Sequence, residues 1–269
     1  MDTLRIAAAV VNAPIGKTEH NLAQVSHWTR IAADQGVHLI CFPEMNLTGY
    51  LHTAAAAACA ESIPGTTTAA LTQISGEMGV TILAGMAEKD AAGRLFIIHL
   101  AAGPHGGMDV YRKLHLAPPE QAIFTPGDQV SLFKAGSLTC GIQLCYDAHF
   151  PELTTRMALD GADVVFIPHA SPSRGQTARD KHQSWMRHLT ARAYDNGLFI
   201  VACNQTGRNG NGLEFPGNAV VIDPSGNILA RKLDDKEGLL VVDLDSRALE
   251  HVREHRMRYF LPNRRPDMY

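Results

Sequence analysis

The chain has 269 residues and a formal net charge of -3, with 24 Lys and Arg against 27 Asp and Glu, and 45% of its residues are hydrophobic. This composition provides enough apolar material for a core and lacks the basic charge that nucleic-acid-binding domains usually carry. The five cysteines include no C-x-x-C pair. We therefore interpret them as reduced thiols and predict a cytoplasmic protein. No apolar run reaches the length of a membrane span.

The N-terminal run "LRIAAAVVNAP" predicts a first strand rather than a signal peptide, because no basic region precedes it. Three later segments each combine an amphipathic helical pattern, a glycine and an apolar run. They are "NLAQVSHWTRIAADQGVHLICFPEMN", "ELTTRMALDGADVVFIPHAS" and "HLTARAYDNGLFIVACNQTG". Gly36, Gly161 and Gly197 stand where a helix would end, so each segment predicts a helix followed by a strand.

Strand-like runs without helical patterns lie between these units, and "DPSGN" predicts a hairpin turn between two of them. The runs are "VTILAGMAEKD", "LFIIHLAAG", "DVYRKLHL", "SLTCGIQLC", "GNAVVI", "NILARK" and "GLLVVDLD". The stretch "HTAAAAACAESIPGTTTAA" predicts a loop and a small helix. Because no segment has the composition of a linker, we expect one domain over residues 1–269, an α/β fold whose sheets are covered by helices.

Three polar residues follow apolar strand-like runs: Glu44 after "LICFP", Lys113 after "DVYR" and Cys145 after "LTCGIQL". Ligands of α/β sheets bind at the carboxyl ends of strands, so these side chains are candidates for one site. Their chemistry is complementary, because a carboxylate accepts a thiol proton, an ammonium stabilises negative charge and a sulfur attacks.

The segments "CFPEMNLTGY", "YRKLHL" and "GIQLCYDAHFPE" resemble, in this order, the three signature segments of the nitrilase, or carbon-nitrogen hydrolase, superfamily. The segments "RAYDNGLFIVACNQTG", "DPSGNIL" and "RRPDMY" are also similar to that family, so the resemblance covers nearly the whole chain. It implies a four-layer α-β-β-α sandwich. It also implies a catalytic set of Glu44, Lys113 and Cys145, supported by Glu120 in "HLAPPEQ", with no metal and no organic cofactor.

The resemblance further implies how the nucleophile works. Cys145 would lie on a tight strand-to-helix turn with its sulfur exposed, where Lys113 and a helix N-terminus favour the thiolate. Asp147 is a plausible cap of that helix, and Pro151 would occupy its first turn. The backbone amide of Tyr146 would act with Lys113 as an oxyanion donor.

The nucleophile segment also favours a class of substrate. Amidase-type members of the superfamily often have "CYD" here, whereas nitrilases more often have Trp-Glu after the cysteine. We therefore expect a hydrolase that cleaves a small linear amide or N-carbamoyl compound through a cysteine thioester. A nitrilase, an acyltransferase and a non-catalytic dimeric binding module are the alternatives. The family also implies a homodimer, with a tail from about residue 251 to 269 packed on the partner subunit.

Other residues are candidates for the substrate pocket by their positions at the ends of the second and third helix-strand units: His169, Ala170, Ser171 and Asn204. His149, four residues after Cys145, is a further candidate. Arg174 is a candidate for binding a substrate carboxylate, because related carbamoylases use arginine in this neighbourhood. An exposed loop arginine is an equally good interpretation. His149 or His115 could pair with Cys145 as in cysteine peptidases, but the local signatures of those enzymes are absent.

Overall fold

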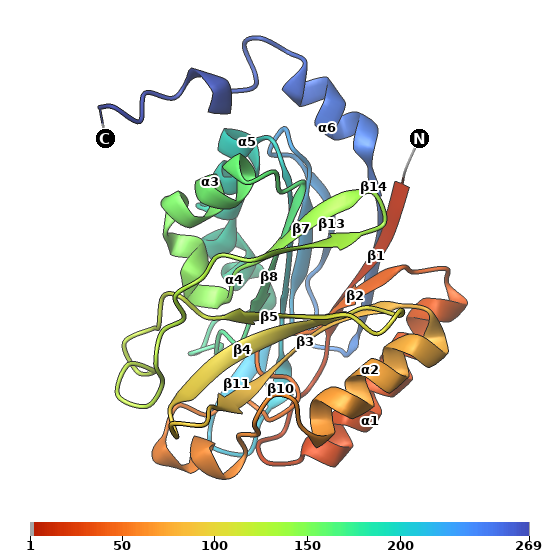
Figure 1. Ribbon diagram of the computed structural model, residues 1–269, viewed down its shortest axis with the longest axis vertical. Coiled ribbons are helices and arrows are strands. Elements are labelled where there is room, and N and C mark those ends of the chain that lie inside the picture. The colour runs from red at the N-terminus through yellow and green to blue at the C-terminus, as the bar shows by residue number, and fades with distance from the viewer. Residues whose placement is uncertain (1–2, 269) are drawn as a thin grey trace.

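The computed structural model describes residues 3–268, which form two six-stranded sheets and one short hairpin (Figure 1). The first sheet has the strand order β14-β1-β2-β3-β4-β5. Its strands are β1 Thr3–Val10, β2 Leu39–Cys41, β3 Thr81–Lys89, β4 Leu95–Ala102, β5 Met108–Arg112 and β14 Gly238–Asp245. The second sheet has the order β13-β12-β9-β8-β7-β6. Its strands are β6 Leu132–Ala135, β7 Leu138–Ile142, β8 Val164–His169, β9 Phe199–Asn204, β12 Ala219–Ile222 and β13 Ile228–Lys232.

Each sheet has three parallel strands at its centre and antiparallel strands at its margins. Strands β1, β2 and β3 are parallel in the first sheet, and β7, β8 and β9 are parallel in the second. The middle strands are β2 and β8, which come from the similar segments "GVHLICFPE" and "GADVVFIPHA". The residues after β2 and β8 lie at the carboxyl ends of the parallel strands of their sheets, the position where ligands of α/β proteins bind.

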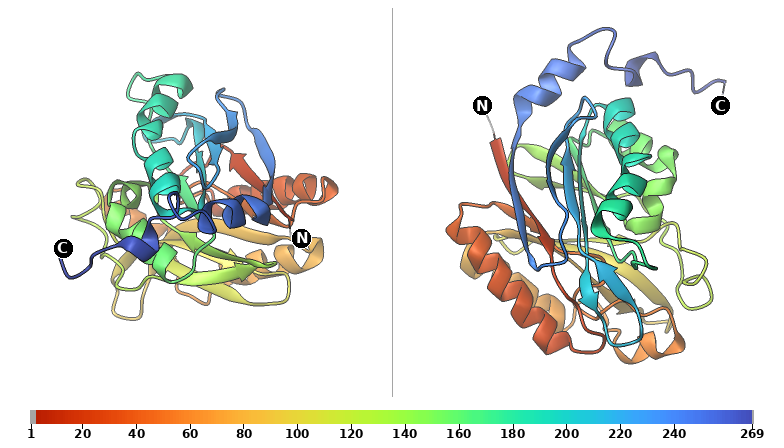
Figure 2. Two further views of the ribbon diagram at one scale, coloured as in Figure 1. Left: turned by 90° about the horizontal axis from the view of Figure 1, so that it is seen from above. Right: turned by 180° about the vertical axis from the view of Figure 1, so that it is seen from behind.

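Helices cover the outer face of each sheet, so the molecule has four layers (Figure 2). The first sheet is covered by α1 Thr18–Asp34 and α2 Thr66–Met78. The second is covered by α3 Pro151–Leu159, α4 Ala178–Met186 and α5 Leu189–Asn196. The predicted α-β-β-α sandwich is thereby confirmed.

The core consists of two apolar clusters, because successive side chains along a strand point to opposite faces of the sheet. Ile40 and Ile82 belong to the cluster under α1 and α2, while their neighbours Leu39 and Leu83 belong to the cluster that fills the rest of the core. The first sheet therefore supplies both clusters, whereas the buried residues of the second sheet belong to the larger one. A sheet buried on both faces explains why these strands are apolar throughout.

The three predicted helix-strand units are present as α1-β2, α3-β8 and α5-β9. Gly36, Gly161 and Gly197 have φ angles of 71°, 97° and 60° just after their helices, a conformation that glycine adopts without a steric penalty. The "DPSGN" hairpin joins β12 to β13. The prediction was incomplete elsewhere: α2 is longer than the small helix expected there, and α4, β6 and the hairpin of β10 Thr206–Arg208 with β11 Glu214–Pro216 were missed.

The C-terminal segment leaves the body of the molecule after β14. Helix α6 Ser246–Arg253 follows that strand, and Arg253 donates to Asp163 Oδ1 at 2.6 Å. Residues 254–268, which include the short η3 Leu261–Asn263, then pass across the end of the molecule beside α5, where Phe260 packs on Tyr194 (Figure 1). Met257 and Met268 in this segment are 80% and 69% exposed. Within residues 3–268, no helix combines the length and the apolarity needed to cross a membrane.

Candidate active site

Cys145 lies on a tight turn between a central strand and a helix. Strand β7 ends at Ile142, the 3-10 turn η2 covers Cys145–His149, and α3 begins at Pro151. Cys145 is partly exposed and has a φ of 45°, a conformation that costs energy for any residue but glycine. Pro151 occupies the first turn of α3, as predicted. The amide of Tyr146 is an early amide of η2, and such amides have no partner within their own helix.

Asp147 does not cap α3, contrary to the prediction, because the N-cap residue is Phe150. The Asp147 carboxylate is instead buried beneath the turn. It accepts hydrogen bonds from the Leu144 amide at 2.9 Å, the Tyr111 hydroxyl at 2.8 Å and the His115 amide at 2.7 Å. Sequence reasoning assigned a structural role to this acid from its position, but two of these partners, Tyr111 and His115, come from β5 and the loop after it. Asp147 therefore fixes the turn of Cys145 against the strand that leads to Lys113.

Glu44 follows β2 and is completely buried. Its carboxylate accepts hydrogen bonds from the Lys113 ammonium at 2.7 Å and from the Ala170 amide at 2.9 Å. The Gln205 side chain donates to the Glu44 carbonyl oxygen at 2.8 Å. The next residue, Met45, has a φ of 52°. Residues from three separate parts of the chain therefore hold Glu44: Lys113 and Ala170 at its carboxylate, and Gln205 at its backbone.

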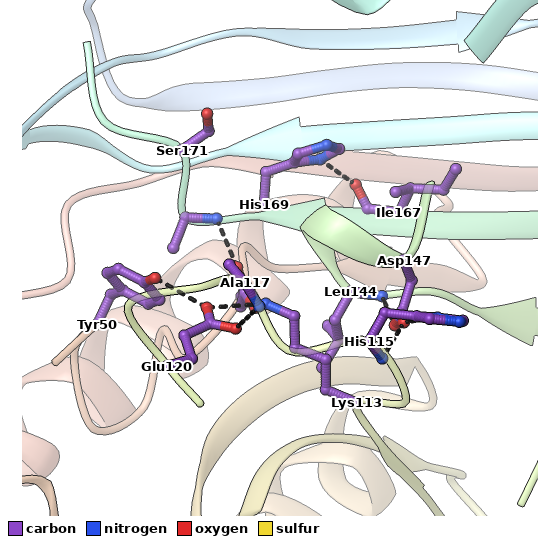
Figure 3. A network of polar contacts seen from close by, with 12 residues as sticks. Tyr50, Lys113, His115, Ala117, Glu120, Leu144, Asp147, Ile167, His169 and Ser171 are labelled. Carbon is purple, nitrogen blue, oxygen red and sulfur yellow. Dashed lines mark hydrogen bonds and ion pairs between the residues drawn. The ribbon is translucent and has the colours of Figure 1, made fainter. Parts of the chain in front are cut away.

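Lys113 directly follows β5, and its ammonium bridges two glutamates. It donates to Glu44 Oε1 at 2.7 Å and to Glu120 Oε1 at 2.9 Å. Glu120 also accepts from the Tyr50 hydroxyl at 2.8 Å and from the Ala117 amide at 2.7 Å (Figure 3). Tyr50 was not predicted, although it lies in the signature segment "CFPEMNLTGY". The structure thus brings together Glu44, Lys113 and Glu120 as the sequence predicts.

Burial and mutual charge set the protonation states of this cluster. Burial raises the pKa of Glu44 to about 7, although Lys113 and the Ala170 amide oppose the shift. Burial alone would lower the pKa of Lys113, but the carboxylates of Glu44 and Glu120 raise it above its usual value. A buried lysine next to two glutamates therefore stays charged, while Glu44 can exchange a proton near neutral pH.

The thiol of Cys145 belongs to the same electrostatic cluster. Burial, followed by the charge of Glu44, raises its pKa, whereas Lys113 and the Ala170 amide act in the opposite direction. The expected net preference for the thiolate is therefore wrong: Lys113 favours the anion, but burial and Glu44 outweigh it. The geometry suits a neutral thiol that transfers its proton to Glu44 when it attacks.

The predicted pocket residues after β8 and β9 have different roles. Ala170 contacts Glu44 through its amide. His169 is buried, its Nδ1 lies 2.7 Å from the Ile167 carbonyl oxygen, and its ring stacks on Trp185 with a centroid distance of 4.2 Å. The Ser171 amide donates to Asn204 Oδ1 at 2.9 Å, and the Asn204 side-chain amide donates to the Ser171 carbonyl oxygen at 3.0 Å. These two hydrogen bonds join the ends of β8 and β9.

The remaining candidates lie around the rim. His149 is exposed and packs on His188 with a ring centroid distance of 4.6 Å. Arg174 is an exposed residue with a φ of 47° in the loop before α4. His115 contacts Asp147 at 2.9 Å and stacks on Phe150. In the described part of the chain, neither His149 nor His115 hydrogen-bonds Cys145, and no group of three or more His, Cys, Asp or Glu side chains could hold a metal ion.

Residues 7–254 match the Carbon-nitrogen hydrolase family. The chain belongs to this family. The prediction of an enzyme, a cysteine-dependent amidohydrolase of the nitrilase superfamily, is thereby confirmed. The chain is 29% identical to a nitrilase of Pyrococcus abyssi, with 99% of each chain covered. It is 32% identical to an (R)-stereoselective amidase of a Pseudomonas species, with 88% of this chain and 84% of that protein covered.

A solved structure of this superfamily shares the fold. A cysteine-to-alanine mutant of the amidase from Nesterenkonia AN1 has a TM-score of 0.84 and 27% identity, covering 98% of this chain and 95% of that chain. Another mutant of that amidase carries the acetamide moiety of fluoroacetamide covalently added at its active site cysteine; it has a TM-score of 0.82 and 28% identity, covering 98% and 95%.

Proposed function

We propose that this carbon-nitrogen hydrolase cleaves a small linear amide or N-carbamoyl compound through a thioester on Cys145. The observation that carries the proposal is the position of the Glu44 carboxylate between the Lys113 ammonium and the Ala170 amide, in electrostatic contact with the Cys145 thiol. A base, a cation and a nucleophile in one cluster are the groups that acyl transfer needs. The amidase names of several relatives support the same class of substrate.

The first half of the reaction forms the thioester. The Cys145 sulfur bonds to the carbonyl carbon as its proton passes to Glu44. Lys113 and the Tyr146 amide stabilise the negative charge that develops on the carbonyl oxygen, and one such donor typically contributes about 3 kcal/mol. The carbon–nitrogen bond then breaks, and ammonia or an amine leaves with the proton that Glu44 had accepted.

The second half returns the enzyme to its starting state. Glu44 accepts a proton from a water molecule, whose oxygen attacks the thioester carbon. The carbon–sulfur bond breaks, the acid leaves, and Glu44 returns the proton to the Cys145 sulfur. Glu120 does not exchange protons in this scheme. It fixes Lys113, since it accepts from that ammonium while the Tyr50 hydroxyl and the Ala117 amide hold its own oxygens.

Nitrile hydrolysis is the second candidate function, because a relative 29% identical over 99% of this chain is called a nitrilase. Both reactions use the same thiol and the same proton acceptor, and they differ in whether a nitrile or an amide carbon is attacked. The Tyr146–Asp147 pair after the nucleophile, in place of the Trp-Glu pair more common in nitrilases, favours the amide.

The test is ammonia release from a panel of short-chain amides, ω-amido acids, N-carbamoyl amino acids and nitriles, with the native protein and with Cys145→Ala. We expect release from amides or carbamoyl compounds, none from nitriles, and none from the variant. Mass spectrometry of the native protein quenched in acid should find the acyl adduct on Cys145. Release that survives Cys145→Ala contradicts the mechanism, and silence across the panel turns attention to acyl transfer to an amine or thiol.

We also propose that the protein is a cytoplasmic homodimer. The tail from about residue 251 supports this, because Met257 and Phe260 are exposed there at 80% and 38% and Phe260 packs on Tyr194 of α5. Such apolar side chains are typical of surfaces that a partner covers. Light scattering of the full chain should give the mass of a dimer, and the Met257→Asp/Phe260→Asp double variant should give that of a monomer.

A further inference from the structure

Lys181 is a buried lysine of α4 that has no polar partner for its side chain within residues 3–268. The residue is 9% exposed, and its ammonium takes part in no hydrogen bond or ion pair there. The adjacent acid, Asp180, is engaged elsewhere, since its carboxylate accepts from the amide and the hydroxyl of Thr177 at 2.9 and 2.8 Å. Burial of an unpaired ammonium is costly. This ammonium is therefore available to pair with an anion from outside the chain.

The helix face that carries Lys181 covers the active-site end of strand β8. The buried residues of α4 are Ala178, Lys181, His182 and Trp185. Trp185 lies one turn after Lys181 and stacks on His169, the last residue of β8, at 4.2 Å. The next residue, Ala170, donates its amide hydrogen to Glu44. Lys181 therefore lies one helical turn from a side chain that packs on the strand forming the site.

The charges that act on Lys181 come from the site itself. Burial lowers its pKa, a negative charge on the Cys145 sulfur opposes that shift whenever the thiol is ionised, and the Arg174 guanidinium adds to it. The ammonium nitrogen is not fully enclosed and keeps some contact with solvent. A small ligand bound at Cys145 can therefore place an anionic group beside this ammonium.

We propose that Lys181 determines the specificity of the enzyme by binding a carboxylate group that the substrate carries in addition to its scissile amide. The substrate class is then a small amide with a free acid group, either a monoamide of a dicarboxylic acid or an N-carbamoyl amino acid. This inference rests on the proposed function, because it takes Cys145 as the position of the scissile carbon. Arg174 adds a second, exposed cation at the outer edge of the same region.

Charge fixes the orientation of such a substrate. Two carboxylates and one ammonium, those of Glu44, Glu120 and Lys113, surround the reacting end of the site. With both glutamates ionised this cluster has an excess of negative charge, so it repels a carboxylate and accepts a neutral amide. The lone ammonium of Lys181 attracts the carboxylate to the α4 side. A substrate with one neutral and one anionic end therefore binds in a single direction.

The first test compares turnover of two substrates of matched shape, succinate monoamide, which is anionic, and succinamide, which is neutral. We expect the native enzyme to prefer the anionic amide in kcat/KM, mainly through KM. Lys181→Met should lower the ratio of anionic to neutral kcat/KM about 10- to 100-fold, the effect of one charge-assisted hydrogen bond, and Lys181→Arg should restore most of the ratio. Arg187→Met removes an exposed cation from the other end of α4 and should leave the ratio unchanged.

The second test needs no turnover. It measures how fast iodoacetate, which is anionic, and iodoacetamide, which is neutral, alkylate the Cys145 thiol, with Cys145→Ala identifying the adduct. The ratio of the two rates cancels the reactivity of the thiol itself. Lys181→Met should lower the iodoacetate-to-iodoacetamide ratio about tenfold, and Arg187→Met should not change it. If Lys181 served only to stabilise the thiolate, both rates would fall together and the ratio would stay constant, which would overturn the proposal.

The two tests separate this inference from the proposed function. A native enzyme that releases no ammonia from either amide contradicts the proposed function, while its alkylation ratio still decides whether Lys181 selects an anion. A native enzyme that hydrolyses succinamide as well as succinate monoamide, with a ratio that Lys181→Met does not alter, overturns the inference and leaves the hydrolase function intact. Circular dichroism of each variant shows whether it is folded before either ratio is interpreted.

Discussion

The hydroxyl of Tyr111 donates a 2.8 Å hydrogen bond to the carboxylate of Asp147, and this contact joins the strand that ends before Lys113 to the turn that holds Cys145. Both residues are buried. That carboxylate also accepts from the backbone amides of Leu144 and His115 and lies 2.9 Å from His115 Nδ1, so Tyr111 supplies its hydroxyl donor, which a substitution can remove. The nucleophile and the cation are therefore coupled through a residue that takes no part in the chemistry.

Tyr111→Phe removes this hydrogen bond and keeps the ring. Because a hydrogen bond to a buried charged group contributes about 1.5 to 3 kcal/mol, we expect the free energy of unfolding in urea to fall by that amount. Tyr194→Phe is the matched control, since Tyr194 is 47% exposed, and its free energy of unfolding should change by less than about 0.5 kcal/mol. Equal effects of the two substitutions would show that the Tyr111–Asp147 contact adds nothing to stability.

The acidic side of the pH profile should report the ionisation of Glu44. Glu44 must be ionised to accept the thiol proton, and its pKa is about 7, so activity is present above that pH and lost as the pH falls through it. We expect kcat/KM for a neutral amide to fall about tenfold per pH unit well below pH 7. Circular dichroism at each pH separates titration from unfolding. A rate that stays constant down to about pH 5 would mean that Glu44 is not the proton acceptor.

Much of the catalytic cluster was predictable because its members lie in short segments at strand ends. Glu44, Lys113 and Cys145 each follow a strand-like run, and the short segments around them resemble the signature segments of the family. The parts that sequence reasoning missed depend on which strands are neighbours. The Ala170 amide reaches Glu44 across 126 positions of the chain, and no local pattern specifies that contact.

The same reason explains two further differences. Asp147 has the local pattern of a helix cap, but donors from β5 and the loop after it override that pattern, because Tyr111 lies 36 positions away and reaches the same carboxylate. Helix α4 was missed because only its buried face, with Lys181 and Trp185, distinguishes it from a polar loop. A lysine on an inner helix face can be identified only after the fold has shown what that face covers.

Glu120→Gln should slow catalysis and move the pH profile. The glutamate accepts from the Lys113 ammonium, the Tyr50 hydroxyl and the Ala117 amide, so an amide NH₂ in either orientation would face a donor. We expect kcat to fall about 30- to 100-fold. The charge of Glu120 also contributes to the raised pKa of Glu44, so its removal should shift the acidic limb to lower pH.

The control for this substitution is Glu254→Gln, which neutralises an exposed acid after α6. It should change neither kcat nor the pH at which the acidic limb of the activity profile falls. A fall in kcat for Glu120→Gln without any movement of the limb would mean that Glu120 and Glu44 are not coupled as their common partner Lys113 suggests.

Gly85→Ala should disturb Glu44 from the neighbouring strand. Gly85 lies in β3, and a methyl group there would come within 2.7 Å of the Met45 backbone nitrogen and of His99 Nδ1. The Met45 backbone already holds a φ of 52° and cannot yield without moving Glu44. Overpacking of this kind costs about 1 to 3 kcal/mol, so we expect a lower free energy of unfolding in urea together with a lower kcat. Gly107→Ala, where an added methyl group meets nothing within 4 Å, should leave both near the native values. If Gly85→Ala lowered stability but kept full kcat at a temperature where it is folded, the close approach of β3 would serve packing alone and would not position the Glu44 carboxylate.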